Sequence, residues 1–557
     1  MDDLLDKIQQ SKKYHFWIFF ALLLFLSALM MYFYQPLCTG SDFFFHYRRF
    51  QALMDGMKDS PFLIYLDYTA IDGYGYFTKA FYSDVILIPF ALVGNLTNAA
   101  FAYEFMIFTM TVLCGILTYI TINSIYKNTY AAAIGAILFT FAIYRLFDIY
   151  HRAALGEALS FTFIPIVFLG VYQIIKGDYK KWYILTIGFS LMIFTHLIST
   201  VLMFVTMLIL LLIYSRSLLK EPKRIWYLVL AGLITIVIVS YYVWPMAEQM
   251  FSNLFYYDRG EEIFNPQRLA HPVGWVIWGM FTGILIPKQA FIPGVGLLLT
   301  CAIILRLFVY EKSPKLKSID IGVIIGLCYI IACLPMFPWS VFPFTLLSFI
   351  QLPWRLLEFS SFFFAVAEGY YLSRILKTNM RRLLAVGGVV VAIALVFANN
   401  AREYQLYRCE EPITTEATII NYYHLGGAEY IPLKVPSVDF LAERKDSVLH
   451  RQNETIISDF VRNKNVVEFT VDTHKRDSLE LPLLYYKGYH ARLNGKDIPV
   501  TESSHGLVQV AVDQQGRVEA YYKGTLIQKL SFCTTILSIF ALCGYIFFQN
   551  RKRKHLK

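Results

Sequence analysis

Long apolar stretches separated by short basic connections dominate the chain up to about residue 399. The clearest are Tyr14–Tyr34, Ala99–Ile122, Tyr130–Phe147, Leu159–Ile175, Trp226–Trp244 and Leu383–Phe397. Each is near or above the length needed to cross about 30 Å of hydrocarbon. A further run, Leu526–Phe548, lies near the C-terminus. The pattern predicts an all-α polytopic membrane domain over residues 1–399, and a final transmembrane anchor with a basic cytoplasmic tail over 526–557. In all, about 12 transmembrane helices are expected.

The positions of Lys and Arg predict how these helices are oriented, because short basic loops stay on the cytoplasmic side of a membrane. Basic connections occur at Lys127, Lys176–Lys181, Arg216–Arg224, Lys312–Lys317, Arg374–Arg382 and Arg551–Lys557. Placing all of them inside makes both termini cytoplasmic and requires an even number of crossings. The apolar segments Phe81–Val93 and Val273–Ile286 then fit only as interfacial or re-entrant pieces.

The stretch from 400 to 525 has a different pattern, with short alternating runs broken by turn signals. These runs are Val466–Val471, Leu481–Tyr486, His490–Leu493, Leu507–Val512 and Val518–Tyr522. Alternation with a period of two and turns such as Asn494-Gly495 is typical of antiparallel strands. The segment is therefore predicted to be a C-terminal β-sandwich-like domain on the extracytoplasmic side.

Composition supports a membrane protein, because the chain is 57% hydrophobic and only 16% charged. An ordinary globular core cannot bury that much apolar surface. The net charge of +10 lies mostly on the inner loops, which indicates orientation and contact with anionic membrane lipids rather than with nucleic acid. Six of the eight cysteines lie in predicted spans, whereas Cys38 and Cys409 lie outside and are candidates for a disulfide.

Candidate chemistry begins in the first outer loop, predicted over residues 35–98. If the segment after Ser41 is helical, then Asp42, His46 and Arg49 fall at positions i, i+4 and i+7 on one face. A carboxylate, an imidazole and a guanidinium together can deprotonate a hydroxyl, bind a cation or hold a phosphate. The alternative is that Asp42 only caps a helix that lies beside the membrane.

Further ionisable residues lie at the predicted outer face. Arg152 and Glu157 stand at the mouth of an apolar helix, where the alternative is a mutual surface ion pair. His196 lies at a hairpin tip, where an imidazole without a role is the alternative. Arg355, in the segment Gln-Leu-Pro-Trp-Arg, is placed to bind a phosphate through two N–H groups of its guanidinium. The alternative is that its side chain extends to the phosphate of bulk lipid.

These motifs, taken in order, resemble those of bacterial GT-C glycosyltransferases. The likeness rests on Gly-Ser-Asp-(x)3-His-(x)2-Arg at Gly40–Arg49, Asp-Gly-Tyr-Gly-Tyr at Asp72–Tyr76, Arg152-(x)4-Glu157, His196, and Gln351–Arg355. The nearest branch is that of YfhO-type proteins and the related membrane proteins labelled 6-pyruvoyl-tetrahydropterin-synthase-related. Two sequence segments of the outer domain, Leu483–Lys496 and Tyr521–Thr525, also resemble the β module of that branch.

The resemblance implies an integral membrane glycosyltransferase of the cytoplasmic membrane. Such an enzyme transfers a sugar, with inversion, from a polyprenyl-phosphate-linked donor to a cell-envelope glycopolymer or lipid acceptor on the outer face. Asp42 and Glu157 would be the catalytic acidic residues, and Asp42 is also the candidate ligand for a divalent cation, Mg or Mn, although no cofactor is certain. The residues assigned to substrate binding are His46, Arg49, Arg152, His196 and Arg355.

Two other classes of protein remain open. A lipid or polysaccharide flippase or other transporter also has many helices and polar clusters, but usually carries ionisable residues near mid-membrane and shows paired repeats. No repeat is visible in this sequence, and the polar groups gather at one predicted face. The third reading is an envelope scaffold that uses the β module and needs neither Asp42 nor Arg355.

Overall fold

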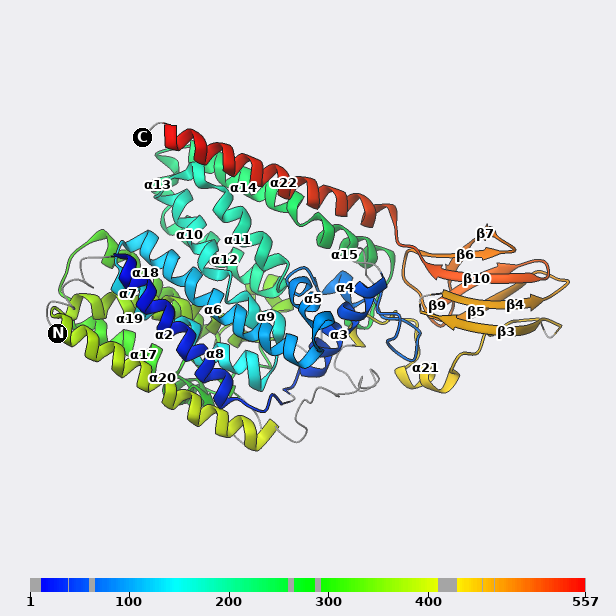
Figure 1. Cartoon of the computed structure of the whole chain (residues 1–557), viewed down its shortest axis with the longest axis horizontal. Helices are drawn as coiled ribbons and strands as arrows, with labels where there is room; N and C mark the ends of the chain where they lie inside the picture. The colour runs from blue at the N-terminus through cyan, green and yellow to red at the C-terminus, as the bar shows by residue number, and fades with distance from the viewer. Residues whose placement is uncertain are drawn as a thin grey trace. The chain divides into compact units, whose positions relative to one another are not determined.

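The computed structural model describes residues 12–38, 40–59, 66–258, 265–285, 292–408, 428–452, 454–464 and 466–555. These residues are mostly helical, with a group of strands before the last helix (Figure 1). The chain divides into two compact units. The first unit contains Met1–His46, Ala100–Thr235 and Ile263–Ala417, and the second contains Tyr47–Ala99, Ile236–Glu262 and Thr418–Lys557.

The first unit is built from helices. Its longer helices are α2 (Lys12–Phe33), α6 (Ala99–Tyr126), α7 (Thr129–Thr140), α10 (Ile164–Ile175), α11 (Tyr183–Ile193), α12 (Leu197–Ile213), α14 (Lys223–Ile238), α16 (Val273–Thr282), α17 (Gly296–Leu305), α18 (Pro314–Ala332), α19 (Leu357–Ile375) and α20 (Asn379–Arg408). Short helical pieces are α8 (Ile143–Leu146), η1 (Phe147–His151), α9 (Leu155–Ser160), η2 (Tyr179–Lys181), α13 (Ser215–Leu219), η5 (Arg306–Phe308), η6 (Phe344–Ile350) and η7 (Pro353–Leu356). A two-stranded ribbon pairs β1 (Ile284–Leu285) with β2 (Ile292–Pro293).

Several of these helices have the length and composition of membrane spans, which marks the chain as a membrane protein. Among the described residues, five stretches qualify: Tyr14–Phe33, Ala99–Tyr126, Thr129–His151, Asn379–Leu406 and Leu526–Lys552. A sixth is obtained if α14 and α15 (Ser240–Ser252) form one broken span. Four shorter apolar helices lie at Ile164–Ile175, Leu197–Ile213, Val273–Thr282 and Gly296–Phe308. The expected number of about twelve spans stays a prediction.

Several predicted spans are broken helices, which explains the smaller number. The run Leu159–Ile175 is split because α9 ends at Ser160 and α10 restarts at Ile164, with Pro165 in its first turn. Proline lacks a backbone N–H and suits the start of a helix rather than its interior. The longest helices in the two segments expected to be interfacial are α5 (Ile88–Leu96), which extends past Val93, and α16. At 1.5 Å per residue each reaches about half the hydrocarbon thickness.

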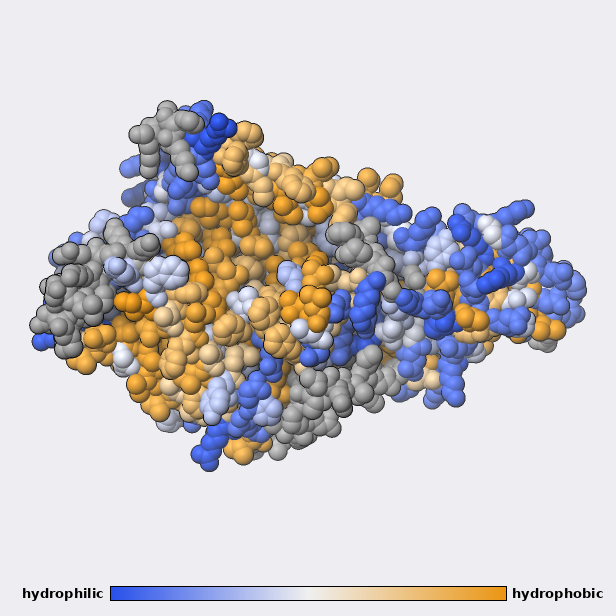
Figure 2. All heavy atoms as spheres, in the orientation of Figure 1, coloured by the Kyte–Doolittle hydropathy of each residue, from blue (hydrophilic) through white to orange (hydrophobic). Residues whose placement is uncertain are grey.

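The core of the first unit lies around α7 and its continuation. In an apolar 18-residue stretch of the span Thr129–His151, 94% is buried, against 22% in the corresponding stretch of Asn379–Leu406. Gly135 lets α7 pack closely, because a Cβ added there would lie 2.8 Å from Cδ1 of Ile122 and 3.0 Å from the carbonyl oxygen of Ala365 on α19. Hydrophobic residues gather over the surface of the helices, whereas the strand region is largely hydrophilic outside (Figure 2). Exposed apolar side chains on α20, such as Val391 and Leu395, are suited to lipid.

The second unit joins short helices to an antiparallel β region. Its helices are α3 (Phe43–Asp59), α4 (Thr78–Phe81), α5, α15, η9 (Ala428–Tyr430), α21 (Val438–Arg444) and α22 (Leu526–His555). Its strands are β3 (Ile456–Asn463), β4 (Val466–Asp472), β5 (Asp477–Leu484), β6 (Tyr489–Leu493), β7 (Lys496–Ile498), β8 (Val500–Glu502), β9 (Leu507–Val512) and β10 (Gly516–Tyr522). They form one sheet in the order β3-β4-β10-β6-β7 and another in the order β5-β9-β8.

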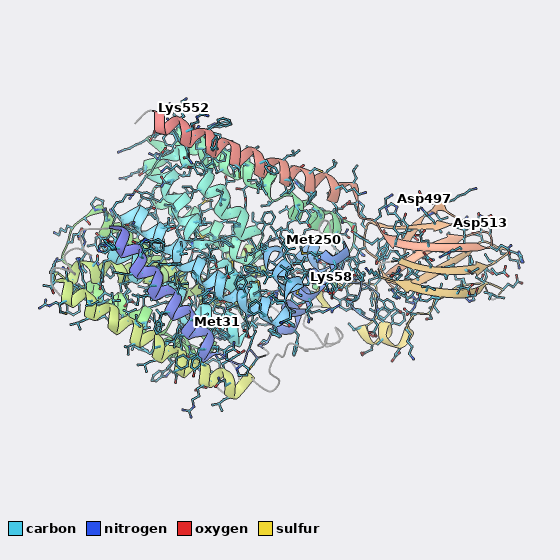
Figure 3. The ribbon with its side chains drawn as sticks, in the orientation of Figure 1. Met31, Lys58, Met250, Asp497, Asp513 and Lys552 are labelled. Atoms are coloured by element: carbon cyan, nitrogen blue, oxygen red, sulfur yellow. The ribbon has the colours of Figure 1, made fainter. Side chains whose placement is uncertain are left out.

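The predicted strands agree well with this β region. All five runs fall on strands, and the Asn494-Gly495 turn joins β6 to β7 with both residues at positive φ, as a type I′ turn requires. The sequence missed β3, β7 and β8. Strand β3 was missed because its sequence, IISDFVRN, does not alternate and is largely exposed, and the other two are only three residues long. Figure 3 labels Asp497 on the β6–β7 hairpin, where it pairs with Arg492 at 3.0 Å.

The cysteines largely follow the expectation. The six in predicted spans are free thiols: Cys114, Cys301, Cys328, Cys333, Cys533 and Cys543. Cys38 is in a disulfide. Its candidate partner, Cys409, lies outside the described residues.

Glu480 on β5 is the main buried ion-pair member of the β region. It pairs with Arg444, whose Nη2 also donates to the Glu480 carbonyl oxygen at 2.7 Å, and it lies 3.0 Å from Nδ1 of His505. Burial alone would raise the pKa of Glu480. Hydrogen bonds from Ser503 and Arg444, together with the Arg444 charge, hold that pKa below its usual 4.5.

The depressed pKa of Glu480 predicts acid sensitivity of the β region. Ionised Glu480 stabilises the fold at pH values above 4.5, and this contribution is lost as the pH falls through the lower folded-state pKa. Hydrogen-exchange protection of β5 amides in the full chain, corrected for the intrinsic exchange rate, should therefore fall more steeply below pH 4.5 in the wild type than in Glu480→Gln. Equal pH profiles for the two proteins would contradict the assignment.

Candidate functional site

A wide helical turn in the first unit creates the densest cluster of ionisable side chains. Segment η1 is a π-helix, and Ala153 follows it with a positive φ of 56° before α9 begins. π-Helical turns and positive φ at a residue other than glycine are both uncommon and occur often at functional sites. This local geometry brings Asp148, Arg152 and Glu157 to one place on the inner side of the turn.

Glu157 is the centre of the cluster. Its Oε2 accepts from Nη1 of Arg152 at 2.8 Å and from Nε of Arg355 at 3.0 Å. Its Oε1 accepts from the hydroxyl of Tyr144 on α8. The side chain is 0% exposed, so this carboxylate holds two guanidinium groups in a region that excludes water.

Arg355 contacts Glu157 although it lies 198 residues further along the chain. Gln351 has a positive φ of 65°, and Pro353 opens the 3-10 turn η7 that carries Arg355 to the start of α19. Nη1 of Arg355 donates to the carbonyl oxygen of Ile350 at 2.7 Å and to Oε1 of Gln351 at 3.2 Å. Within the described part of the chain, Nη2 of Arg355 and Nη2 of Arg152 have no hydrogen-bond partner. Both Nη2 groups can therefore donate hydrogen bonds to a bound anion.

Asp42 is held beside the cluster by its own backbone. Its N–H donates to the carbonyl oxygen of Arg152 at 2.7 Å, and its Oδ2 lies 3.4 Å from Nε of the same arginine. Gly40 permits this approach, because a Cβ there would lie 2.6 Å from that of Ala153. The Asp42 side chain is 41% exposed, so it is the carboxylate of this cluster that a solute can reach.

The loop that carries Asp42 is anchored by the helix before it. Tyr34, just after α2, stacks on Tyr150 with ring centroids 3.8 Å apart. The hydroxyl of Tyr150 donates to Sδ of Met31, which is labelled near the end of α2 in Figure 3, at 3.7 Å. These contacts fix the start of the loop against the π-helical turn.

Two further carboxylates lie deeper. Asp148 is 0% exposed and lies 3.7 Å from Nη1 of Arg152, but neither of its oxygens has a hydrogen-bond partner among the described residues. Glu358 on α19 accepts from the hydroxyl of Ser160 through Oε1, while its Oε2 is without such a partner in the described regions. The cluster thus contains two guanidinium groups and four carboxyl groups.

His196 lies at the edge of the cluster. It is the N-cap of α12, where its Nδ1 accepts from the backbone N–H of Ser199 at 3.3 Å and lies 2.8 Å from the Ser199 hydroxyl. A Cβ added at Gly156 would lie 3.3 Å from the His196 ring, so α9 packs directly against this imidazole. Because Gly156 directly precedes Glu157 on α9, His196 lies next to Glu157.

Arg49 has an ion-pair partner of its own in the second unit. Arg49 lies on α3 in the second unit, where its Nε is 3.3 Å from Oδ1 of Asp84 and its guanidinium lies over the ring of Tyr82. Lys79 Nζ is 3.7 Å from the other Asp84 oxygen. Burial raises the pKa of Asp84 and lowers that of Lys79, and their mutual attraction opposes both shifts. These three residues form a separate buried ion-pair cluster.

His46 is placed as the helical spacing predicts. Helix α3 begins at Phe43, and the His46 N–H donates to the Asp42 carbonyl oxygen at 3.3 Å. The side chain is 5% exposed and its ring lies edge-on to Phe45.

The sequence therefore predicted a group of which four members, Asp42, Arg152, Glu157 and Arg355, lie in contact and a fifth, His196, lies beside them. The suggestion of a surface ion pair between Arg152 and Glu157 is corrected, because the pair forms but Glu157 is fully buried. Sequence reasoning missed the roles of four neighbouring residues: Tyr144, Asp148, Ser160 and Glu358. An acidic residue inside an apolar run was the signal available for Asp148.

A metal ion would compete with arginine for two of the carboxylates in this cluster. Oε2 of Glu157 is already shared by two guanidinium groups, and Oδ2 of Asp42 faces Arg152. Cations at this distance compete directly with a metal for the same oxygens. Among the residues that the structure describes, no three His, Cys, Asp or Glu side chains are grouped so as to hold a metal ion.

Comparison with protein-family models gave no matching family, and a search of curated proteins gave no match.

Replacing Glu157 by Gln should strongly destabilise the protein. Two buried guanidinium groups would lose their shared countercharge, and breaking such a buried pair typically costs roughly 3–5 kcal/mol. The thermal unfolding midpoint of the purified protein in detergent measures the effect. Asp497→Asn removes an exposed ion pair and should leave the midpoint unchanged. Similar midpoints for the two variants would show that Glu157 does not hold the cluster together.

Proposed function

We propose that this protein is an integral membrane glycosyltransferase of the GT-C type. In this proposal it transfers a sugar from a polyprenyl-phosphate-linked donor to a cell-envelope glycopolymer or lipid acceptor. The observation that carries the proposal is the juxtaposition of two guanidinium groups, Arg152 and Arg355, with one accessible carboxylate, Asp42. Transfer from a lipid phosphate needs cations for the departing phosphate and a base for the acceptor hydroxyl.

The proposed topology has about twelve crossings of the cytoplasmic membrane, with both termini inside and the β region outside. The five or six helices that are long enough to cross a membrane, and the four shorter apolar helices, are the candidates for these crossings. The basic connections support the orientation. In this arrangement the Asp42 loop, the Arg152–Glu157 turn and Arg355 share the outer face.

Asp42 is the proposed base. Its carboxylate takes the proton of the acceptor hydroxyl as that oxygen attacks the anomeric carbon of the sugar. The bond from this carbon to the polyprenyl-phosphate oxygen breaks, and its electron pair leaves with the phosphate. Attack from the side opposite to the phosphate inverts the anomeric centre.

The arginines are proposed to hold the donor phosphate. Nη2 of Arg152 and Nη2 of Arg355 have no hydrogen-bond partner in the described part of the chain. Guanidinium groups bind phosphate through directed, charge-assisted hydrogen bonds. Glu157, between them, acts as the acidic residue that positions both cations. His46 and His196 are assigned to the walls of the sugar pocket.

A divalent cation is not used in this scheme. The carboxylates that would bind Mg or Mn are paired with arginine, as described above, so the cationic role falls to Arg152 and Arg355. A metal requirement at Asp42 remains a separate prediction, which a chelator test on the active membranes addresses.

Replacing Asp42 by Asn should abolish sugar transfer while preserving the fold, because Asn has nearly the same shape as Asp and keeps the backbone hydrogen bond to Arg152. Loss of a general base lowers a rate by roughly 10²–10⁴-fold. Cells that lack the protein and express each variant should be compared by mass analysis of teichoic acids, wall polysaccharides and polyprenyl-phosphate sugars. We expect a missing modification and accumulated donor with Asp42→Asn.

The matched control is Asp55→Asn, which removes an exposed carboxylate from α3, the helix that follows Asp42. It should restore the modification fully. Unchanged sugar content in cells with membrane-inserted Asp42→Asn protein would sink the enzymatic proposal.

A flippase or transporter is the second candidate, and one observation favours it. Asp148 lies fully buried in the candidate span Thr129–His151, with both oxygens lacking a hydrogen-bond partner among the described residues. Buried acidic residues within membrane helices are typical of transport pathways and proton relays. For a transporter, vesicles that contain the protein should move lipid-linked sugar across the membrane without changing it chemically, and Asp148→Asn should stop that movement. Production of a new glycosidic bond by the same vesicles would favour the enzyme.

A further inference from the structure

A second feature of the first unit lies away from the arginine cluster. A pocket of about 240 Å³ opens among α6, α10, α12, α18 and α19. Its walls are mainly apolar, and include Ile122, Phe168, Leu210, Phe362 and Val366. Gly322 on α18 helps to keep it open, since a Cβ there would lie 2.8 Å from Cδ1 of Phe363 and push that ring.

The mouth of the pocket is basic. Lys176, just after α10, and Lys315, in the first turn of α18, both line it. Lys176 Nζ lies 4.2 Å from the centre of the Tyr214 ring, and Lys315 Nζ donates to the carbonyl oxygen of Tyr126 at 2.8 Å. Lys317 lies in the same first turn of α18 as Lys315, and its charge adds to partial burial in lowering the pKa of Lys176.

These lysines come from two basic connections that are far apart in the sequence. Lys176 belongs to Lys176–Lys181, and the other two belong to Lys312–Lys317. Within the described ranges, none of the three makes a salt bridge. Like charges that converge without a countercharge raise the local affinity for an anion.

The nearby acidic residues are engaged elsewhere. Glu221 pairs with Arg224, Glu311 with Arg374 and Asp320 with Arg306. Asp178 caps η2 by accepting from the backbone N–H of Lys180. The positive charge at the mouth is therefore not neutralised by the carboxylates closest to it in sequence.

We propose that this pocket binds an anionic phospholipid, with one acyl chain among the apolar walls and the phosphate held by Lys176, Lys315 and Lys317. Charge complementarity selects a phosphate, and the apolar interior selects a hydrocarbon chain over a soluble anion. An ammonium group has three donors, so Lys315 can keep its bond to Tyr126 and still reach a phosphate oxygen. This inference does not depend on the proposed glycosyl transfer.

The site predicts selective retention of phosphatidylglycerol. The purified full-length protein, stripped of lipid in detergent, is titrated with phosphatidylglycerol or phosphatidylcholine, and the first bound lipid is measured by native mass spectrometry. We expect the double variant Lys176→Gln/Lys317→Gln to bind phosphatidylglycerol about 25-fold more weakly, since each lysine near an anionic headgroup contributes roughly fivefold. Binding of phosphatidylcholine should be weak and unchanged.

Two further variants make the test specific. Lys180→Gln/Lys220→Gln removes the same charge from lysines that do not line the pocket, and should keep wild-type affinity. Leu210→Trp fills the pocket from a half-buried position without touching the charges, and should also lose the first lipid. Thermal unfolding of each variant confirms that it is folded.

Three results would overturn the proposal. The first is equal loss in the two lysine pairs, which would mean unspecific surface attraction. The second is unchanged binding in both Lys176→Gln/Lys317→Gln and Leu210→Trp. The third is displacement of the first phosphatidylglycerol by inorganic phosphate at millimolar concentration, which would show that the acyl chain contributes nothing.

Discussion

The buried carboxylate of Glu157 is the constraint on which the rest of the helical unit depends. One oxygen of this side chain holds both Arg152, five residues before it, and Arg355, 198 residues after it. In a region without water each of these charges is costly alone, and the set is stable only when every member is present. The ion pairs therefore fix the start of α19 against the π-helical turn, and this in turn fixes the place where Asp42 docks.

The geometry divides the carboxylates by exposure. Glu157 and Asp148 are fully buried, whereas Asp42 is 41% exposed and touches the same guanidinium as they do. The buried carboxylates hold the guanidinium groups in place, whereas the exposed carboxylate of Asp42 can contact a solute. Gly40 and Gly156 permit these close contacts. A side chain at Gly40 would push the Asp42 segment away from Ala153, and one at Gly156 would push α9 away from His196. A site of this kind needs rigid support close to its reacting groups, and here the support is the packed α7–α19 core.

Much of this arrangement was predictable from the sequence. Alternation and turn signals located five strands, and helical spacing placed Asp42 at the start of α3. The ionisable residues in apolar surroundings identified Arg152, Glu157 and Arg355. The breaks at Ser160 and Val239 were not predictable in this way, because hydropathy does not register where a helix is interrupted. The ion-pair partner of Arg49 was not predictable either, since its one-turn spacing from His46 does not reveal that Asp84 pairs with it.

The most direct test of the central claim measures whether the arginine pair binds a lipid-linked phosphate. The purified protein in nanodiscs is titrated with polyprenyl phosphate, and the wild type is compared with Arg355→Lys, which keeps the charge but loses the planar fork. The account predicts at least about tenfold weaker binding for Arg355→Lys, a loss of roughly 1.4 kcal/mol, with its fold intact by circular dichroism. Equal affinity of the two proteins, or no binding by the wild type, would contradict it.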